Sequence, residues 1–201
     1  AGGNYEESEM RNLFLYMTTT VDGFVAGPED ELDWMRQVPD EDLTADIVEL
    51  LSRADSGFLG YPVAIGMIPY WRSVESNPEA SAANRAIAQT VNRLHPIVIS
   101  NVDTELPWDN AELLVARDDA ELVDAVIKLK REPGTDLSVA GGVRTAQRFA
   151  RLGLVDEYVF LVHPVALGQG KPVFTHRADL ALVDTKTYPS GIIRVRYRPL
   201  R

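Results

Sequence analysis

The chain has 201 residues, and acidic side chains outnumber basic ones 30 to 20, which gives a formal net charge of −10. This charge argues against a protein that binds nucleic acid or another polyanion through clustered Lys and Arg. Apolar residues make up 45% of the chain, cysteine is absent and no segment is long and apolar enough to cross a membrane, so we expect a cytoplasmic globular protein without disulfides or thiolate metal sites.

The organisation of the chain predicts a single domain over residues 10–201. Residues 1–9, AGGNYEESE, have neither the basic start nor the apolar centre of a signal peptide, and we expect a flexible leader or a cloning remnant there. No internal repeat or Pro/Gly/Ser-rich linker divides the rest of the chain.

Apolar periodicity and turn residues predict an alternation of strands and helices. We expect strands at 11–18, 57–60, 96–100, 111–116, 137–140 and 157–163, a long loop at 21–34, helices from Asp40, at 79–93, at 118–131 and at 143–152, and a closing hairpin at 180–199. This order predicts a three-layer α/β/α domain with a mixed, mostly parallel sheet, to which the hairpin adds an antiparallel edge. The tail arginines 194, 196, 198 and 201 alternate along a strand, and we expect them on one solvated face.

Two adjacent glycines, Gly141 and Gly142, lie between a predicted strand and a predicted helix in SVAGGVRTAQ. Ligands of open α/β sheets bind beyond the carboxyl ends of the strands, and the N–H groups at a helix start attract an anion. Val143, Arg144 and Thr145 would supply these N–H groups, and Thr145 also a hydroxyl. The alternative is a tight turn without a ligand. The run is not the spaced G-x-G-x-x-G fingerprint of a standard dinucleotide fold.

The loop TTTVDGFVAGPEDELDWM follows the first predicted strand and would cross the mouth of the sheet. Asp22 could act electrostatically or relay a proton, and Asp33 beside Trp34 could hold a polar heterocycle against an aromatic wall. The alternative is that Asp22 only forms a turn with Gly23 and that Asp33 is a solvated acid.

Other candidate motifs do not indicate a specific chemistry. Gly168, Gly170 and Lys171 lack the Ser/Thr and the helix that a P-loop needs, so we expect a sharp connection there. The three histidines show no metal-binding spacing, and no metal is expected. His163, at the end of an apolar strand, is favoured as a hydrogen-bonded structural residue over a catalytic base.

Together, LFLYMTTTVDGFVAGPEDELDWM, VAGGVRTAQRFARLGLVDEYVFLVHPVALGQGKPVF and KTYPSGIIRVRYRP resemble the dihydrofolate reductase-like family related to the C-terminal reductase domain of the bifunctional riboflavin-biosynthesis deaminase-reductase. The resemblance extends over residues 11–199. It implies a dihydrofolate reductase-like fold and an NADPH-dependent, often homodimeric reductase of a small pterin- or pyrimidine-like heterocycle.

The resemblance also implies roles for individual residues. Thr20 and Asp22 would face the nicotinamide and the substrate as catalytic residues, and Trp34, with Asp33, would line the substrate pocket. The implied cofactor-binding residues are Gly60, Ser100, Ala140, Gly141, Gly142, Val143, Arg144 and Thr145.

Two turns differ from the usual pattern of this family. Where the family has a Gly-Arg-x-Thr-Tyr turn, this chain has GYPVA at residues 60–64, and where the family has Ser-Arg-Thr, it has SNVD at residues 100–103. Both changes remove an arginine that would contact cofactor phosphates. Three functions are therefore considered: an NADPH-dependent reductase, an oxidoreductase that uses NADH or a flavin, and a non-catalytic small-molecule-binding protein.

Overall fold

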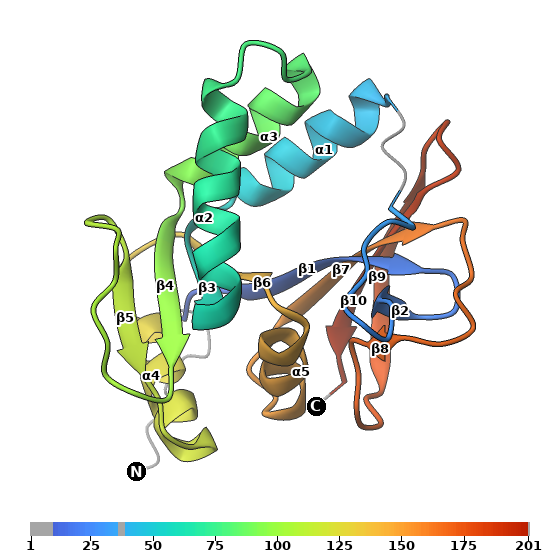
Figure 1. Cartoon of the computed structure of the whole chain (residues 1–201). Coiled ribbons are helices and arrows are strands. Elements are labelled where there is room, and N and C mark those ends of the chain that lie inside the picture. Colours follow the sequence, from blue (N-terminus) through green and yellow to red (C-terminus); the bar gives the residue numbers. More distant parts are fainter. Residues whose placement is uncertain (1–9, 36–38, 201) are drawn as a thin grey trace.

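The computed structural model describes residues 10–35 and 39–200, and the leader expected at residues 1–9 lies outside this part of the chain. Strands and helices alternate along it (Figure 1). The strands are β1 (Leu13–Thr20), β2 (Phe24–Ala26), β3 (Ala54–Gly60), β4 (His95–Ser100), β5 (Glu112–Val115), β6 (Asp136–Gly141), β7 (Glu157–His163), β8 (Lys171–Pro172), β9 (Leu180–Thr187) and β10 (Ile193–Pro199). The helices are α1 (Glu41–Ser52), α2 (Tyr61–Ser76), α3 (Ala82–Arg93), α4 (Asp119–Arg131) and α5 (Val143–Arg151).

The main sheet of the described chain has eight strands in the order β5-β4-β3-β6-β1-β7-β10-β9. All neighbours from β5 to β7 are parallel, whereas β10 is antiparallel to both β7 and β9. The predicted mixed, mostly parallel sheet with an antiparallel closing hairpin is therefore confirmed. β2 pairs with β8 in a separate small antiparallel sheet, so the loop expected at 21–34 contains one short strand.

Helices cover both faces of the sheet: α1, α2 and α3 lie on one face, and α4 and α5 on the other (Figure 1). Successive side chains of a strand point to opposite faces. Leu13 and Leu15 accordingly pack in the cluster that contains Phe149 of α5, whereas Phe14 packs with Leu94 at the end of α3. The three β1 side chains are fully buried, and each such burial contributes about 1.5–3 kcal/mol. The predicted three-layer architecture is confirmed.

Helix α2 is the helix that the sequence pattern does not predict. Its residues include Pro62, Gly66 and Pro69, which normally interrupt helices. Pro62 lies in the first turn, where a missing N–H group breaks no helical hydrogen bond. Ala64 and Ile68, one turn apart, are buried against the sheet, and this tertiary packing offsets the poor helix propensity. Because α2 directly follows β3, it brings a helix start to the carboxyl edge of the sheet.

The arginines of β10 do not all lie on the solvated face that the sequence predicts. Arg196 binds Glu157 at 3.0 Å and Asp184 at 2.8 Å, and Arg194 binds Asp184 at 3.2 Å. Only 22% and 24% of the Arg194 and Arg196 side chains are exposed, so a solvated face was the wrong prediction for these two residues. The acidic partners on the neighbouring strands, which the period-2 pattern does not reveal, account for the difference. Arg198 is exposed as expected, and Arg201 lies outside the described residues.

Candidate active site

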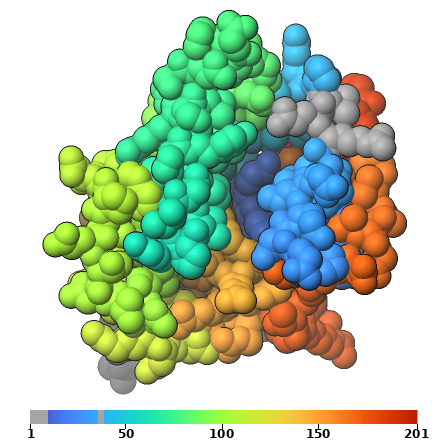
Figure 2. All heavy atoms as spheres, viewed as in Figure 1, coloured from blue at the N-terminus to red at the C-terminus, as the bar shows by residue number. Residues whose placement is uncertain are grey.

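Five neighbouring parallel strands end at one edge of the sheet. In sheet order, β4, β3, β6, β1 and β7 end at Ser100, Gly60, Gly141, Thr20 and His163. The ends of β4 and β3 lie close together, because Gly60 pairs in register with Ile99, and the ends of β1 and β7 are level, because Thr20 pairs with His163. β1 continues beyond the end of β6, since Leu15 pairs with Val139. Figure 2 shows a hollow at this edge, between α2 in teal and the blue segment that follows β1, with gold residues of β6 and α5 beneath. This is the edge where open α/β sheets bind ligands.

Helices α2 and α5 begin at this edge, and their first N–H groups have no side-chain cap. Their N-cap residues are Gly60 and Gly142, and neither helix has an acidic residue in its first turn. The helices α1, α3 and α4 are instead capped by the side chains of Asp40, Ser81 and Asp118. The two helix starts that meet at the edge therefore present uncapped N–H groups, an arrangement that attracts an anion.

The turns that carry these two helices approach each other closely. A Cβ added at Gly60 would lie 2.7 Å from Oγ1 of Thr145, and one added at Gly142 would lie 3.1 Å from Cγ2 of Val63. Gly142 also has a φ of 93°, in the left-handed region that favours glycine. The two glycines therefore allow the starts of α2 and α5 to lie side by side, with the Thr145 hydroxyl beside both turns.

Ser100 lies beside these turns at the end of β4, and its side chain shapes the loop that follows. Its Oγ donates to the carbonyl oxygen of Val102 at 2.7 Å and is 3.2 Å from the N–H group of the same residue. Asn101 and Asp103, in the same loop, are exposed. The structure thus places Ser100 next to the glycine turns, with its own hydroxyl already hydrogen-bonded.

Thr20 and Asp22 hold the loop after β1 against the loop after β7. Oγ1 of the buried Thr20 donates to Oδ1 of Asp22 at 2.6 Å and accepts from the N–H group of Phe24 at 3.0 Å. The Asp22 carboxylate also accepts from the N–H groups of Leu167 and Gly168, the latter at 2.7 Å. The Thr20 hydroxyl and then the Gly168 N–H group lower the pKa of Asp22. The carboxylate therefore stays ionised at neutral pH and acts as an acceptor.

Trp34 and His163 form an aromatic pair at the β7 end of the edge. Their ring centroids are 5.7 Å apart and the rings meet edge to face at 88°. Burial lowers the pKa of His163, so its ring is neutral at neutral pH. Nε1 of Trp34 is buried and has no hydrogen-bond partner within residues 10–35 and 39–200. A bound ligand with an acceptor group would satisfy this donor. Asp33, beside Trp34, is exposed.

The predicted site residues therefore form two groups along one edge. The residues from Ala140 to Thr145 lie with Gly60 and Ser100 near the middle of the sheet, and Thr20 and Asp22 lie on the β1–β7 side with Trp34. The structure places His163 at the carboxyl end of β7 beside Trp34, and the interpretation of it as a hydrogen-bonded structural residue stays a prediction. Sequence reasoning missed α2 as a helix, and with it the pairing of two helix starts.

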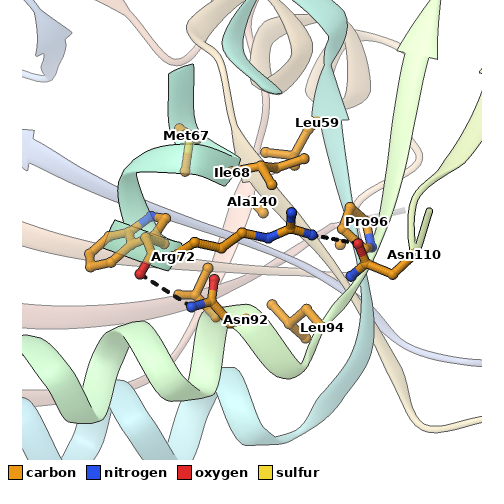
Figure 3. Close-up of a pocket in the computed structure, with 12 residues that line it drawn as sticks. Leu59, Met67, Ile68, Arg72, Asn92, Leu94, Pro96, Asn110 and Ala140 are labelled. Atoms are coloured by element: carbon orange, nitrogen blue, oxygen red, sulfur yellow. Dashed lines mark hydrogen bonds between the residues drawn. The ribbon is translucent and has the colours of Figure 1, made fainter. Parts of the chain in front are cut away.

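A second hollow lies away from this edge, on the sheet face beneath α2 and α3 (Figure 3). Its volume is about 40 Å³, and apolar side chains such as Leu59, Ile68 and Leu94 line it. Arg72 at its rim donates to Oδ1 of Asn110 at 2.6 Å. The hollow is too small for a heterocycle, and no histidine or carboxylate lines it.

The residues that the structure describes contain neither a candidate metal centre nor a candidate membrane span. No group of three or more histidines or carboxylates there has an arrangement that could hold a metal ion. None of the helices in the same residues combines the length and the apolar character that a membrane span requires.

The sequence matches a known family over most of its length. The family profile described as the RibD C-terminal domain matches residues 11–193. The chain belongs to the RibD C-terminal domain family. A curated relative is the uncharacterised protein YyaP of Bacillus subtilis (strain 168), which is 30% identical over 192 residues, 94% of this chain and 95% of YyaP.

Solved structures share the fold. One is the diaminohydroxyphosphoribosylaminopyrimidine deaminase/5-amino-6-(5-phosphoribosylamino)uracil reductase of Thermotoga maritima, with a TM-score of 0.67 and 15% identity over 98% of this chain and 58% of that protein. Another is dihydrofolate reductase of Enterococcus faecalis complexed with NADP(H), with a TM-score of 0.57 and 10% identity over 94% of this chain and 97% of that protein. At such low identities the likeness shows the fold, which is the one that the resemblance implied.

Proposed function

We propose that this protein is an NADPH-dependent reductase of a small pterin- or pyrimidine-like heterocycle. The observation that carries the proposal is the pair of uncapped helix starts of α2 and α5, which meet at the turns of Gly60 and Gly142. Two adjacent helix starts of this kind suit the two phosphates of a dinucleotide. Membership of the RibD C-terminal domain family supports a reductase.

The residues at the middle of the edge fit a nicotinamide dinucleotide. The N–H groups at the starts of α2 and α5 would bind the pyrophosphate, and the Thr145 hydroxyl lies close enough to both turns to add a donor. At Gly60 and Gly142 a side chain would intrude on a neighbouring residue. The bound NADPH would supply the hydride.

The residues on the β1–β7 side would bind and orient the heterocycle. The indole N–H of Trp34 would donate to an acceptor on the ring, and the neutral His163 would complete an apolar wall. Asp22 holds the loops after β1 and β7 together, so it would position this wall and help to exclude water. We propose that Thr20 acts with Asp22 in this way, and that Asp33 contributes at the exposed mouth of the pocket.

One observation favours the competing functions. The turns at Gly60–Ala64 and Ser100–Asp103 have no arginine, and Asp103 is exposed. Each lost charge-assisted contact to a phosphate removes about 1.5–3 kcal/mol. This loss would suit an enzyme that uses NADH or a flavin, or a non-catalytic small-molecule-binding protein.

A calorimetric titration with NADPH, NADH, FMN and FAD tests the proposal. We expect micromolar binding of NADPH, after which pterins and pyrimidines are screened for oxidation of the bound nicotinamide, followed by its absorbance. Tight binding of a flavin alone would replace the proposal with flavin chemistry. Absence of binding by all four nucleotides would leave the non-catalytic role.

We also propose that the protein is a homodimer in the cytoplasm. Leu182 and Val183 of the edge strand β9 are 61% and 40% exposed, and exposed apolar side chains on a sheet edge are typical of association. Light scattering of the wild type and of Leu182→Lys tests this proposal: a monomeric wild type would contradict it.

A further inference from the structure

The central strand β1 becomes accessible to solvent partway along its length. Its first residues, Leu13, Phe14 and Leu15, are fully buried, whereas Tyr16 and Thr18 are partly exposed. Helices cover both faces of the sheet, so exposure in a central strand requires an opening in this cover. Figure 2 shows dark-blue atoms of the β1 region at the floor of the hollow beside α2. The exposed part of β1 therefore faces the candidate active site.

Tyr16 and Thr18 point to the face of the sheet on which α2 lies. Alternate side chains of a strand share a face, so Phe14, Tyr16 and Thr18 point the same way. Phe14 packs with Leu94 at the end of α3, which identifies this face as the one that α1, α2 and α3 cover (Figure 1). Since α2 borders the hollow, Tyr16 lies beneath the opening on this face.

β1 lies between the two groups of site residues. On one side it pairs with β7, whose last residue, His163, pairs with Thr20 and contacts Trp34. On its other side it pairs with β6, and the register places Tyr16 level with Ala140, the residue before the two glycines. Tyr16 therefore stands between the turn proposed for the dinucleotide and the aromatic pair proposed for the heterocycle. Hydride transfer between these two ligands would take place there.

The Tyr16 hydroxyl is directed toward the edge and keeps its proton at neutral pH. It is hydrogen-bonded to the side chain of Thr18, the next residue on this face toward the edge. Thr18 is the donor in this bond, because the bond lowers the pKa of Tyr16. Burial outweighs the bond and raises the pKa of Tyr16 to about 12. The Tyr16 proton is then available to an acceptor in the hollow.

Reduction of a C=N bond in a heterocycle requires such a proton. The carbon receives a hydride, which turns NADPH into NADP⁺, and the nitrogen must receive a proton. Asp22 does not supply it, because its carboxylate is ionised and accepts from the N–H groups of Leu167 and Gly168. The O–H group of Tyr16 can release its proton to the nitrogen, which is far more basic than a phenolate once the hydride has arrived. The phenolate then regains a proton from solvent through the partly exposed Thr18 hydroxyl.

We infer that Tyr16 is a catalytic residue, whose hydroxyl donates a hydrogen bond to a ring nitrogen of the heterocycle and protonates it as the hydride arrives. The inference rests on the proposed function, because it requires a nicotinamide dinucleotide and a heterocycle on either side of β1. It also defines the substrate class as a heterocycle with a C=N bond whose nitrogen faces the floor of the hollow.

The test compares the wild type with Tyr16→Phe and Tyr158→Phe, each of which loses one hydroxyl and keeps its ring. Tyr158→Phe is the matched control: Tyr158 is a buried tyrosine on the neighbouring strand β7, its pKa is also raised to about 12, and its pairing with Leu15 places it on the opposite face of the sheet. Circular dichroism and thermal melts check that both variants are folded.

Two readouts are measured for each protein. Calorimetry follows the binding of pterin to the nucleotide-free protein and, separately, the binding of NADPH. Absorbance follows the oxidation of NADPH by dihydrofolate, which contains a C=N bond. We expect Tyr16→Phe to weaken pterin binding about five-fold, the size of one neutral hydrogen bond, and to lower kcat at least about 100-fold. Its Kd for NADPH should change less than about two-fold, and Tyr158→Phe should match the wild type in all three quantities.

Other outcomes overturn the inference in distinguishable ways. An unchanged kcat in Tyr16→Phe would exclude proton donation by Tyr16, and an unchanged affinity for pterin would remove its hydroxyl from the substrate site. Parallel losses of thermal stability, pterin binding and NADPH binding in this variant would assign Tyr16 a structural role instead. A wild type that binds NADPH but does not reduce dihydrofolate would overturn the inference and leave the nucleotide site. A wild type that does not bind NADPH would overturn the proposed function as well.

Discussion

Gly60 lies directly against Thr145: a Cβ added at Gly60 would come within 2.7 Å of the Thr145 hydroxyl oxygen. The two residues belong to different strand–helix units, since Gly60 ends β3 and Thr145 lies in the first turn of α5. Their contact brings the uncapped starts of α2 and α5 together. The candidate cofactor site depends on this approach.

Replacing Gly60 with alanine tests whether this approach matters for binding. Gly60 has a φ of −68°, which alanine adopts without strain, so the added methyl group acts mainly by displacing Thr145. We expect the Kd for NADPH to rise at least about ten-fold, the size of one lost hydrogen bond to a charged group. The control is Gly66→Ala, in α2 with open space around it, which should gain up to about 1 kcal/mol of stability and keep its affinity. Equal affinities in both variants would contradict this role for the turn.

A bulky side chain at Gly142 should abolish nucleotide binding without unfolding the protein. Gly142 has a φ of 93°, so Gly142→Leu carries a backbone cost of about 1–2 kcal/mol and also fills the space beside Val63. Gly153→Leu has a similar cost, because Gly153 has a φ of 68°, but it faces open space at the end of α5. Thermal melts should show similar losses of stability for the two variants. Calorimetry should show lost NADPH binding in Gly142→Leu alone, and unchanged binding in that variant would remove Gly142 from the site.

Most of the fold was predictable, because the sequence patterns that indicate its strands and helices are local. The apolar runs that form β1 and β7 and the alternating halves of the β9–β10 hairpin are each readable within about eight residues. Helix α2 was not predictable, because Pro62, Gly66 and Pro69 argue against it locally. The burial of Ala64 and Ile68 that stabilises it depends on distant strands.

The candidate site was predictable only in part, because some of its contacts join residues that are far apart in the sequence. Gly141 and Gly142 stand between a strand and a helix, which is a local pattern. The contact of Gly60 with Thr145 has no local signal, because it forms only when β3 and β6 pair. The partners of Asp22 were likewise hidden, since the N–H groups of Leu167 and Gly168 lie in a loop after β7.

We expect Asp22 to act by holding the loop after β7 in position. Asp22→Ala removes the acceptor of two N–H groups that tie the loop after β7 to the turn after β1. We expect faster hydrogen exchange of the Leu167 and Gly168 amides and a lower kcat/KM, while NADPH binding changes less than about three-fold. Asp22→Asn keeps a side-chain oxygen and should restore part of the protection. Unchanged exchange in Asp22→Ala would contradict the positioning role.

Glu157 should make the protein sensitive to acid. Burial alone would raise the pKa of this 1% exposed carboxyl, but its ion pairs with Arg53 and Arg196, each at 3.0 Å, outweigh burial and lower the pKa. Since the folded state then holds the proton less tightly than the unfolded state, this stability is present above the ordinary pKa of 4.5 and is lost as the pH falls further.

The variant Glu157→Gln measures this contribution. At neutral pH we expect it to lose about 1–3 kcal/mol, because two arginines lose a charged partner that they hold in partly exposed positions. Its free energy of unfolding, from denaturant titrations at several pH values, should fall less steeply than that of the wild type as the pH drops below about 4.5. Parallel pH profiles for the two proteins would contradict the assignment.

A nicotinamide dinucleotide is proposed to bind across the starts of α2 and α5. The most direct test is to follow the backbone amides by NMR while NADPH is added to the wild-type protein. We expect the largest shifts at Tyr61, Val63 and the residues from Val143 to Thr145, and none at the start of α1, which Asp40 already caps. Shifts confined to other parts of the molecule, or no shifts at saturating NADPH, would contradict it.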